Sequence, residues 1–308
     1  MSYHIVSIDS PQCSITCKDG QLICKNNDGE QRKLPLEDVA SIIITSFSAS
    51  IHSNLFLEAA KQGVALIICE SFKPVSLVLP ANRSTDTLLT RRQISLPDKQ
   101  RLALWQKTID AKTRNQYSVA AQLAPEDASL PLLKSAMLSK KMHKEAVCAK
   151  LFWQIFGRSQ NAATFTRERY GGGFNALLNY GYAVLLSIVL QKLLGVGIDP
   201  TFGISHVVRE KSAPLAYDLM EPFRPCVDWK VVQWIQKNPE TQEWLVTTPF
   251  RKWITSLPLE KTEYLSLELE LQGCIEGVIR SFRKALLAHS IRYYQPWTLK
   301  NSKWDGSL

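Results

Sequence analysis

Short apolar runs separated by polar turns fill the first eighty residues. We expect strands at residues 3–8, 13–17, 21–24, 39–45, 64–69 and 75–79. Aliphatic and β-branched side chains dominate these runs, and the second of them alternates strictly. Asp19-Gly20, between the second and third runs, is typical of a tight hairpin turn. A short helix is expected to end at Gly63. The first part of the chain is therefore predicted to be rich in β-structure.

Beyond about residue 87 the apolar positions recur every three or four residues, which is the helical period. Leu102, Trp105 and Ile109 follow it, and residues 244–257 and 265–287 are further helix candidates. The segment between the two patterns contains proline and polar residues, as linkers do. We therefore expect an α+β multidomain protein. It has a small, β-sandwich-like N-terminal domain (1–80), a linker (81–86) and a larger all-α domain (87–308).

One segment, residues 175–198, is apolar enough to suggest a membrane span. Asn175, Asn179, Gln191 and Lys192 interrupt it, so a buried core helix is the favoured interpretation. The start of the chain has neither the basic region nor the apolar core of a signal peptide. No role at a membrane is expected, and the predicted location is the cytoplasm.

Charge narrows the range of partners. The formal net charge is +9 and the pI about 9.2, a balance that favours a polyanion, most often nucleic acid. A basic protein without such a partner stays as the alternative. The seven cysteines are odd in number and include no Cys-x-x-Cys pair, which argues against a disulfide framework and a zinc site. We expect Cys13 and Cys17 to be small buried residues.

The basic residues gather in two clusters. The first runs from Arg83 to Arg114 and the second from Arg280 to Lys303. Tyr293, Tyr294 and Trp297 are interleaved with the second cluster, and aromatic rings beside cations suit single-stranded or frayed DNA. Each cluster taken alone is more typical of a solvated helix face. Two clusters in so basic a chain favour a DNA surface.

Two carboxylates one helical turn apart are the first candidates for chemistry. Asp218 and Glu221 are expected to share one face of a helix that begins at Pro214, so both could reach one divalent cation. Arg224 follows, positioned to pair a carboxylate or a phosphate. A hydrated helix surface is the competing interpretation of such a pair.

Two further candidates have weaker local support. His206 follows a segment with three glycines and a proline, whose bend could carry the histidine back over the next helix. Glu145 adjoins the apolar face of a predicted helix, where glutamate is usually an exposed helix former. Nothing local distinguishes Glu145 from any other surface glutamate.

Four segments, in this order along the chain, match one known family. They are residues 145–157, 175–182, 197–206 and 218–228, the last beginning Asp-Leu-Met-Glu-Pro-Phe-Arg-Pro. Looser matches lie at 34–42, at 63–66 and at Lys112 with Asn115-Gln116. Together they resemble the CRISPR-associated endonuclease that serves as the spacer-acquisition integrase. The resemblance runs nearly end to end.

The resemblance implies a metal site. The family's ligands, a glutamate, a histidine and a later acid, fall on Glu145, His206 and Glu221, with Asp218 as a further acid nearby. Ala146 departs from the family's frequent glycine, and some relatives carry aspartate in place of Glu221. Either acid binds a hard cation, so Mg²⁺ or Mn²⁺ is the expected cofactor. The expected DNA contacts are Arg91, Arg92, Tyr180, Arg224, Arg283 and Trp297.

The implied function is metal-dependent DNA integration and cleavage in CRISPR adaptation. In the family, a 3′-hydroxyl of new spacer DNA attacks a phosphodiester at the edge of the repeat. The implied partners are DNA with 3′ ends, the repeat, a second copy of the chain bound through the β-rich domain, and a small ferredoxin-like protein that completes a heterohexamer. Two alternatives stay open. One is a non-catalytic DNA-binding scaffold of the same fold, and the other a transposon-borne integrase relative, which the short stretch after the last predicted helix is expected to disfavour.

Overall fold

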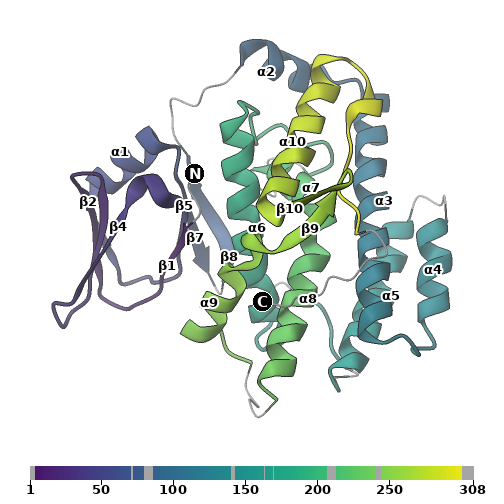
Figure 1. Ribbon diagram of the computed structural model, residues 1–308, viewed down its shortest axis with the longest axis horizontal. Coiled ribbons are helices and arrows are strands. Elements are labelled where there is room, and N and C mark those ends of the chain that lie inside the picture. The colour runs from purple at the N-terminus through teal and green to yellow at the C-terminus, as the bar shows by residue number, and fades with distance from the viewer. Residues whose placement is uncertain are drawn as a thin grey trace.

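The β-rich part lies at one side of the molecule and helices fill the rest (Figure 1). The structure is a computed structural model that describes residues 4–70, 72–79, 86–139, 143–162, 164–168, 170–206, 213–239 and 244–299. A strand-rich region followed by a helical one is the predicted fold class, which is confirmed. Of the predicted linker, residues 81–85 lie outside the described residues.

Two four-stranded sheets form the β-rich region. The first has the order β1 (His4–Ile8), β5 (Val39–Ile44), β7 (Ala65–Glu70) and β8 (Lys73–Val78). The second has the order β4 (Gln31–Pro35), β3 (Gln21–Lys25), β2 (Ser14–Lys18) and β6 (Ser50–Ile51). The sequence did not predict β4, whose polar side chains are exposed at the edge of its sheet, or the two-residue β6.

The two sheets enclose an apolar core, as a sandwich does. Ile15 of β2, Ile42 and Ile44 of β5 and Leu55 of α1 (Ser53–Gln62) are buried in it. The β2–β3 hairpin turns at Asp19 and Gly20, both with positive φ, as the sequence predicted. Gly63 ends α1 in the left-handed conformation at φ 70°, also as predicted.

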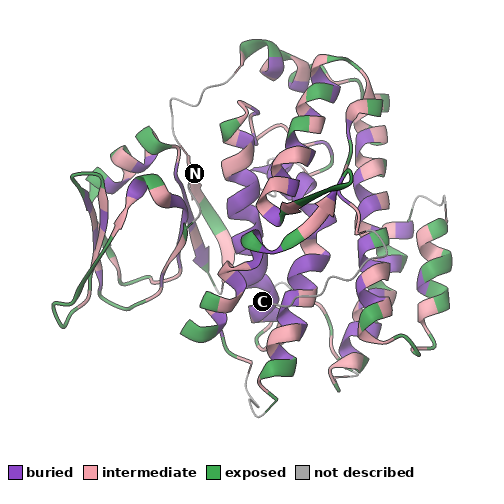
Figure 2. Ribbon diagram, viewed as in Figure 1, coloured by how far each residue is buried: buried purple, intermediate pink, exposed green. Residues whose placement is uncertain are grey.

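The helical region is built around α6 (Phe174–Gly195). Around it lie α2 (Thr87–Ile94), α3 (Asp98–Leu123), α4 (Leu130–Leu138), α5 (Lys144–Ser159), α7 (Pro214–Met220), α8 (Arg224–Lys237), α9 (Thr248–Thr255) and α10 (Leu271–Leu287). Short 3₁₀ turns are η1 (Leu36–Asp38), η2 (Glu221–Phe223), η3 (Leu257–Leu259) and η4 (Ile291–Tyr293). By length and composition α6 qualifies as a membrane span, but 83% of its most apolar window is buried (Figure 2). The predicted core helix is confirmed.

The sheet and the helices share one core. β5 is buried on both faces, because Ile42 and Ile44 face the sandwich while Ile43 joins the core around α6. Ile67 of β7 and Tyr180 of α6 belong to that same core. The first sheet therefore covers the central helix as well as the second sheet, and α3 and α5 lie on the far side of α6 from it (Figure 1).

One element of the helical region differs from the sequence prediction. Residues 265–287 were expected to form one helix, but β9 (Lys261–Tyr264) and β10 (Leu267–Glu270) form a hairpin, and α10 begins only at Leu271. Leu265 and Ser266 turn the hairpin with φ of 49° and 67°. Leucine alternates with serine or glutamate in 265–270, which is the strand period, and the following helical pattern concealed it.

Candidate metal centre and nucleic-acid surface

Glu221 stands at a tight turn between two helices. α7 ends at Met220, η2 carries Glu221, and Pro222 begins the passage into α8. The side-chain amide of Asn115, on α3, donates to the Pro222 carbonyl oxygen over 2.7 Å. The side chain of Glu221 is only 6% exposed. Its position is therefore fixed by α3 rather than by the local turn alone.

Glu145 approaches Glu221 from α5, across α3. The ammonium of Lys112, midway along α3, joins the two: its Nζ lies 2.7 Å from Glu145 Oε1 and 2.8 Å from Glu221 Oε2. Glu145 is in the first turn of its helix, where a carboxylate is favoured by the helix dipole. The structure thus brings together two acids that are 76 residues apart in sequence and places a buried cation between them.

His206 is held by Asp218. Its Nδ1 lies 2.7 Å from Asp218 Oδ1, and its backbone N–H donates to the same oxygen over 3.1 Å. The backbone N–H groups of Ile204 and Ser205 donate to Asp218 Oδ2 over 2.6 and 3.0 Å. A completely buried carboxylate therefore gathers the whole turn before α7 and fixes the imidazole at its edge.

Gly203 makes this turn possible. A Cβ atom at this position would collide with the backbone oxygen of His206 and lie 2.7 Å from Cβ of Pro214. The bend that the sequence predicted upstream of His206 is confirmed. The role expected of Asp218 is corrected, because both its oxygens accept hydrogen bonds from the His206 turn. Asp218 orients the histidine instead of joining Glu221 as a second open acid.

Cations around Glu221 keep it ionised. Burial alone would raise the pKa of Glu221, but Arg224 and Lys112 lower it to about 2. Arg224 Nε lies 2.8 Å from Glu221 Oε1, and the guanidinium lies over the ring of Tyr182, 4.6 Å from its centre. Glu221 Oε2 is buried and lies 2.8 Å from Nζ of Lys112, so this ammonium is its partner. This oxygen is charged and desolvated, and it is paired with a cation of the protein itself.

The described residues hold no ready-made cluster of three His, Cys, Asp or Glu side chains around one point. Instead, Glu145 and Glu221 meet at Lys112, and His206 lies near enough to Glu221 to contribute to the low pKa of that carboxyl. Two of the three predicted ligands thus converge on one buried cation of the protein itself, and the third is held by Asp218. By sequence Lys112 falls in the first basic cluster, so its inward role was missed. The spacing of Lys112 and Asn115, one turn apart, was the available signal.

Two of the expected DNA contacts are wrong. Trp297 is 1% exposed, stacks on Phe223 with ring centres 5.3 Å apart, and donates from Nε1 to the Glu263 carbonyl oxygen. Tyr180 is fully buried in the core around α6. Tyr294 is likewise buried and bonded to Thr108. Trp297 and Tyr294 of the tail and Tyr180 of α6 therefore stabilise the fold, and none of these three rings can reach a base.

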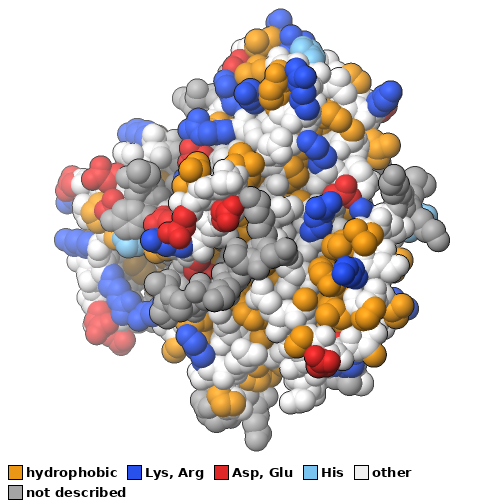
Figure 3. Space-filling model, turned by 45° about the vertical axis from the view of Figure 1, so that its right-hand side comes forward, with side chains coloured by type: hydrophobic (Ala, Val, Ile, Leu, Met, Phe, Trp, Pro, Cys, Tyr) orange, Lys and Arg blue, Asp and Glu red, His pale blue; other side chains and the backbone are white. Residues whose placement is uncertain are grey.

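The remaining arginines mark a basic surface. Arg91 and Arg92 lie on α2 and Arg283 on α10, and α2 and α10 meet where Arg283 pairs with Asp86 over 3.3 Å. Lysine and arginine side chains gather there, at the top of Figure 3. A shallow hollow of 500 Å³ is lined by Arg280, Arg283, Lys284, Leu287 and Ala288. Lys107 is not part of it, since its Nζ donates to the carbonyl oxygens of Ile291 and Tyr294.

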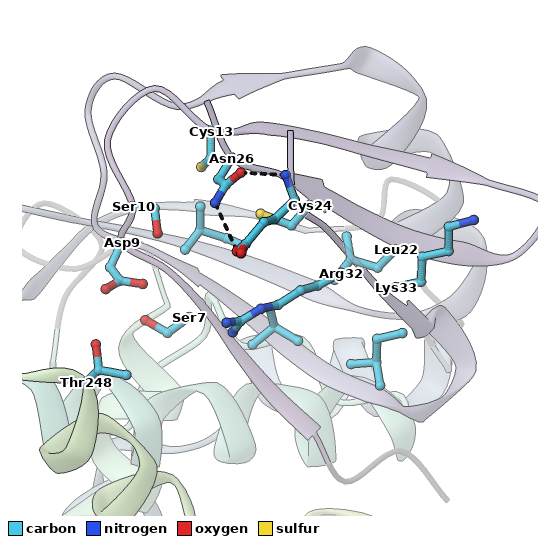
Figure 4. Close-up of a pocket in the computed structure, with 14 residues that line it drawn as sticks. Ser7, Asp9, Ser10, Cys13, Leu22, Cys24, Asn26, Arg32, Lys33 and Thr248 are labelled. Carbon is cyan, nitrogen blue, oxygen red and sulfur yellow. Dashed lines mark hydrogen bonds between the residues drawn. The ribbon is translucent and has the colours of Figure 1, made fainter. Parts of the chain in front are cut away.

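A second hollow lies in the β-rich region and includes none of the metal-ligand candidates. Its volume is 480 Å³, and β1, β3 and β4 line it together with Thr248 of α9 (Figure 4). Arg32 extends across it, and Asp9 lies at its rim (Figure 4). β1 and β4 are edge strands of their two sheets, so the hollow is the open side of the sandwich.

Comparisons with known proteins agree with this arrangement. The family model for CRISPR associated protein Cas1 matches residues 6–249. A CRISPR-associated endonuclease Cas1 from Neisseria meningitidis is 34% identical over 218 residues, 69% of each chain. One from Korarchaeum cryptofilum is 26% identical over 269 residues, 76% of this chain and 78% of its own.

Solved structures share the fold. A casposase bound to integration product has a TM-score of 0.78 at 21% identity, over 98% of this chain and 96% of its own. A CAS1 protein from Thermotoga maritima has a TM-score of 0.75 at 14% identity, over 97% and 100%. The family match, the identity to a curated relative and the shared fold give one answer: this chain belongs to the Cas1 family of CRISPR-associated proteins.

Proposed function

We propose that this protein is a metal-dependent DNA integrase and endonuclease of CRISPR adaptation. The observation that carries the proposal is the convergence of Glu145 and Glu221 on one buried cation, beside a histidine held by Asp218. Surface carboxylates have no reason to converge inside a folded protein, because mutual repulsion and desolvation both oppose it. A non-catalytic scaffold would not need to maintain this arrangement.

The donor set fits a hard divalent cation. Two carboxylates and one imidazole suit Mg²⁺ or Mn²⁺, and Oε2 of Glu221, which pairs with Lys112 in the metal-free protein, is a charged lone-pair donor. Glu145, His206 and Glu221 would hold the ion. Once bound, it supplies Lewis-acid polarisation of a phosphate and stabilises the charge that develops there. A low pKa keeps Glu221 in its ligand form at any physiological pH.

The protein's own residues prepare the site for a phosphodiester. Asp218 accepts from Nδ1 of His206, which sets the proton on Nδ1 and leaves the lone pair on Nε2. Arg224 fixes the other oxygen of Glu221 and adds positive charge near the phosphate. In the proposed reaction, a 3′-hydroxyl oxygen of new spacer DNA bonds to a repeat phosphorus, and the bond to the neighbouring 3′-oxygen breaks. One ester replaces another; with water as the nucleophile, the same site cleaves DNA.

Partners follow from the relatives and from the surface. Solved structures with this fold include a casposase bound to integration product and a Cas6-RT-Cas1–Cas2 complex, the latter with a TM-score of 0.76. We propose that this chain likewise binds DNA with 3′ ends and repeat DNA, and assembles with a small ferredoxin-like partner into a heterohexamer. Arg91, Arg92 and Arg283 are its proposed phosphate contacts, and Arg224 acts nearest the metal.

A homodimer through the β-rich region is part of the proposal. β1 and β4 present unpaired edges beside the hollow in Figure 4, and edges of this kind are normally covered. Light scattering at micromolar concentration should give the mass of a dimer without any partner. Reversing the charge of Arg32 and Lys33 should shift it toward monomer. An unchanged dimer in that variant would place the interface elsewhere.

The test of the enzymatic proposal is strand transfer into repeat DNA. His206→Ala and Glu221→Ala should abolish transfer in Mn²⁺ while the far-ultraviolet circular dichroism stays that of the parent. His52→Ala is the matched control, because His52 is exposed at the start of α1. Normal transfer by a folded His206→Ala variant would refute the site, and no transfer by the parent protein would favour the scaffold alternative.

A further inference from the structure

Lys112 sits where three elements meet. α3 carries it, the first turn of α5 brings Glu145 to it, and η2 brings Glu221. Its side chain is 12% exposed, and its Nζ lies within 2.8 Å of one oxygen of each carboxylate. Without this ammonium, two negative groups would face each other in a desolvated space. Lys112 therefore supplies the charge that allows the site to exist in a folded protein.

This lysine differs from the other buried lysines of the described chain. Lys230 pairs with Glu260, and Lys144 pairs with Asp110, each with a single carboxylate. Lys112 bridges two carboxylates from different elements. A structural ion pair needs one partner of each sign. A cation between two acids occupies the position that a divalent ion would take.

We propose that Lys112 is an exchangeable counter-cation: it holds Glu145 and Glu221 together in the metal-free protein, and a divalent ion displaces it from both. This inference rests on the metal site of the proposed function. The proposal gives a role to Lys112, which is not one of the metal ligands. Metal binding becomes a competition between a divalent ion and the lysine ammonium.

Geometry makes the two cations mutually exclusive. A divalent ion binds carboxylate oxygens at roughly 2.0–2.2 Å, closer than an ammonium does. Glu145 Oε1 and Glu221 Oε2 already lie 2.7 and 2.8 Å from Nζ, so an ion bound to the same oxygens would lie within about 5 Å of the ammonium. Like charges at that distance in a desolvated space repel strongly. One of the two must leave.

Lys112 has a route away from the acids. Glu145 is 36% exposed and Glu221 only 6%, so the cluster opens to solvent on the side of Glu145. The four-carbon stem of lysine is flexible, and its ammonium is strongly hydrated, which favours its release into water. Arg224 stays in place because its guanidinium is bound to the other oxygen of Glu221 and to the face of Tyr182.

The first experiment measures Mn²⁺ binding by titration calorimetry and thermal denaturation. Lys112→Met removes the competing charge and keeps most of the side-chain volume. Its metal-free form should melt lower than the parent, and its Mn²⁺ affinity should rise by about tenfold or more. Mn²⁺ should therefore raise its melting temperature more than that of the parent. Lys230→Met is the matched control: it also breaks a buried lysine–glutamate pair, but Mn²⁺ should not compensate for its loss.

Equal or weaker Mn²⁺ affinity in Lys112→Met would overturn the inference. If that variant does not fold, the proposal can be tested on the unaltered protein instead. Reductive methylation followed by peptide mass spectrometry should modify Lys112 slowly without metal and several-fold faster in Mn²⁺, while Lys230 stays unchanged. No change at Lys112 would also overturn the proposal.

These outcomes separate the exchange from the metal site itself. In one outcome the parent binds Mn²⁺, while neither the Mn²⁺ affinity of Lys112→Met nor the methylation rate of Lys112 changes as expected. That result would reject the role of Lys112 as counter-cation and leave the proposed function intact. No Mn²⁺ binding by the parent or by Lys112→Met would remove the metal site, and the exchange with it.

Discussion

At the scale of single residues, the site depends on side chains whose importance is not visible in their local sequence. Glu145 resembles an ordinary helix-forming glutamate, and only family resemblance distinguished it. Charge and aromatic character associated Lys112 and Trp297 with DNA. In the structure both side chains are turned into the protein. Lys112 pairs with Glu145, and Trp297 donates to the Glu263 carbonyl oxygen, each partner more than 30 residues away in the sequence. Sequence periodicity predicts which face of a helix is buried, but not which distant group a polar or aromatic side chain will meet.

Asp218 gives the first prediction at this scale. Asp218→Asn keeps the side-chain volume but replaces one acceptor oxygen by an NH₂ group. This group cannot accept from the N–H groups of Ile204 and Ser205. The His206 turn should loosen, and Mn²⁺ affinity should fall on the order of 10- to 100-fold, as for other groups that orient a metal ligand. Calorimetric titration measures this. An affinity equal to that of the parent would show that His206 needs no orientation by Asp218.

Asp228 gives a prediction on pH. Burial raises the pKa of Asp228 from 3.8 to about 7, although the hydrogen bond from Tyr182 and the charge of Arg167 lower it. The unfolded chain releases this proton near pH 4 and the folded protein only near pH 7. Stability is therefore lost as the pH rises through this window. Asp228→Asn still accepts from Tyr182 and cannot ionise. Its free energy of unfolding, relative to the parent, should rise by up to about 3 kcal/mol between about pH 5 and pH 8.

Urea denaturation at several pH values measures that difference. Ionic strength and buffer must be held constant, because other carboxylates titrate in the same window and are common to both proteins. A difference between Asp228→Asn and the parent that does not change with pH would mean that Asp228 is ionised throughout.

At the scale of elements, α3 organises the site. It carries Lys112 toward the acids and, one turn later, Asn115 toward the chain end: Asn115 donates to the carbonyl oxygens of Pro222 and Trp297 and accepts from the Leu299 N–H. Strands with clear apolar alternation and helices with a clear period were predictable from sequence. β4 and the β9–β10 hairpin were not, because polar edges and neighbouring helical patterns conceal the strand period.

Asn115→Leu tests this role of α3. The substitution keeps the size of the side chain but leaves three buried backbone groups without their partner, at about 1–3 kcal/mol each where no water replaces it. The free energy of unfolding should fall by several kcal/mol, and strand transfer should fall because the Pro222 turn positions Glu221. Asn238→Leu is the control, since Asn238 makes one local bond to the Trp234 carbonyl oxygen. Equal losses in the two variants would contradict the role assigned to Asn115.

At the scale of the whole molecule, the basic surface lies at one end of α3 and the acids midway along it. Lys112 is roughly 20 Å beyond the start of that helix, at 1.5 Å of rise per residue. DNA that touches Arg91 and Arg283 must therefore extend over roughly six base pairs of duplex, at about 3.4 Å each, to reach Glu145 and Glu221. The sequence predicted such a surface and its arginines Arg91, Arg92 and Arg283, whereas the exclusion of the buried Tyr180 and Trp297 required the structure.

DNA affinity should depend strongly on salt. Reversing the charge of Arg91 and Arg92 should weaken binding to every sequence and flatten the plot of log affinity against log salt, by roughly 0.9 for each phosphate that the variant no longer neutralises. Trp297→Ala is the contrast, because it removes a buried ring. It should lower the free energy of unfolding by about 3–5 kcal/mol and leave the slope of the folded protein unchanged. An unaltered slope in the arginine variant would place the DNA elsewhere.

The hydrogen bonds between Asn115 and residues 297–299 have a consequence for protein engineering. The same amide that supports the turn of Glu221 also fastens Trp297 and Leu299. A deletion of Trp297 and Leu299 would take away two partners of this amide, and a bulky cargo inserted directly after Leu299 would pull on the group that positions Glu221.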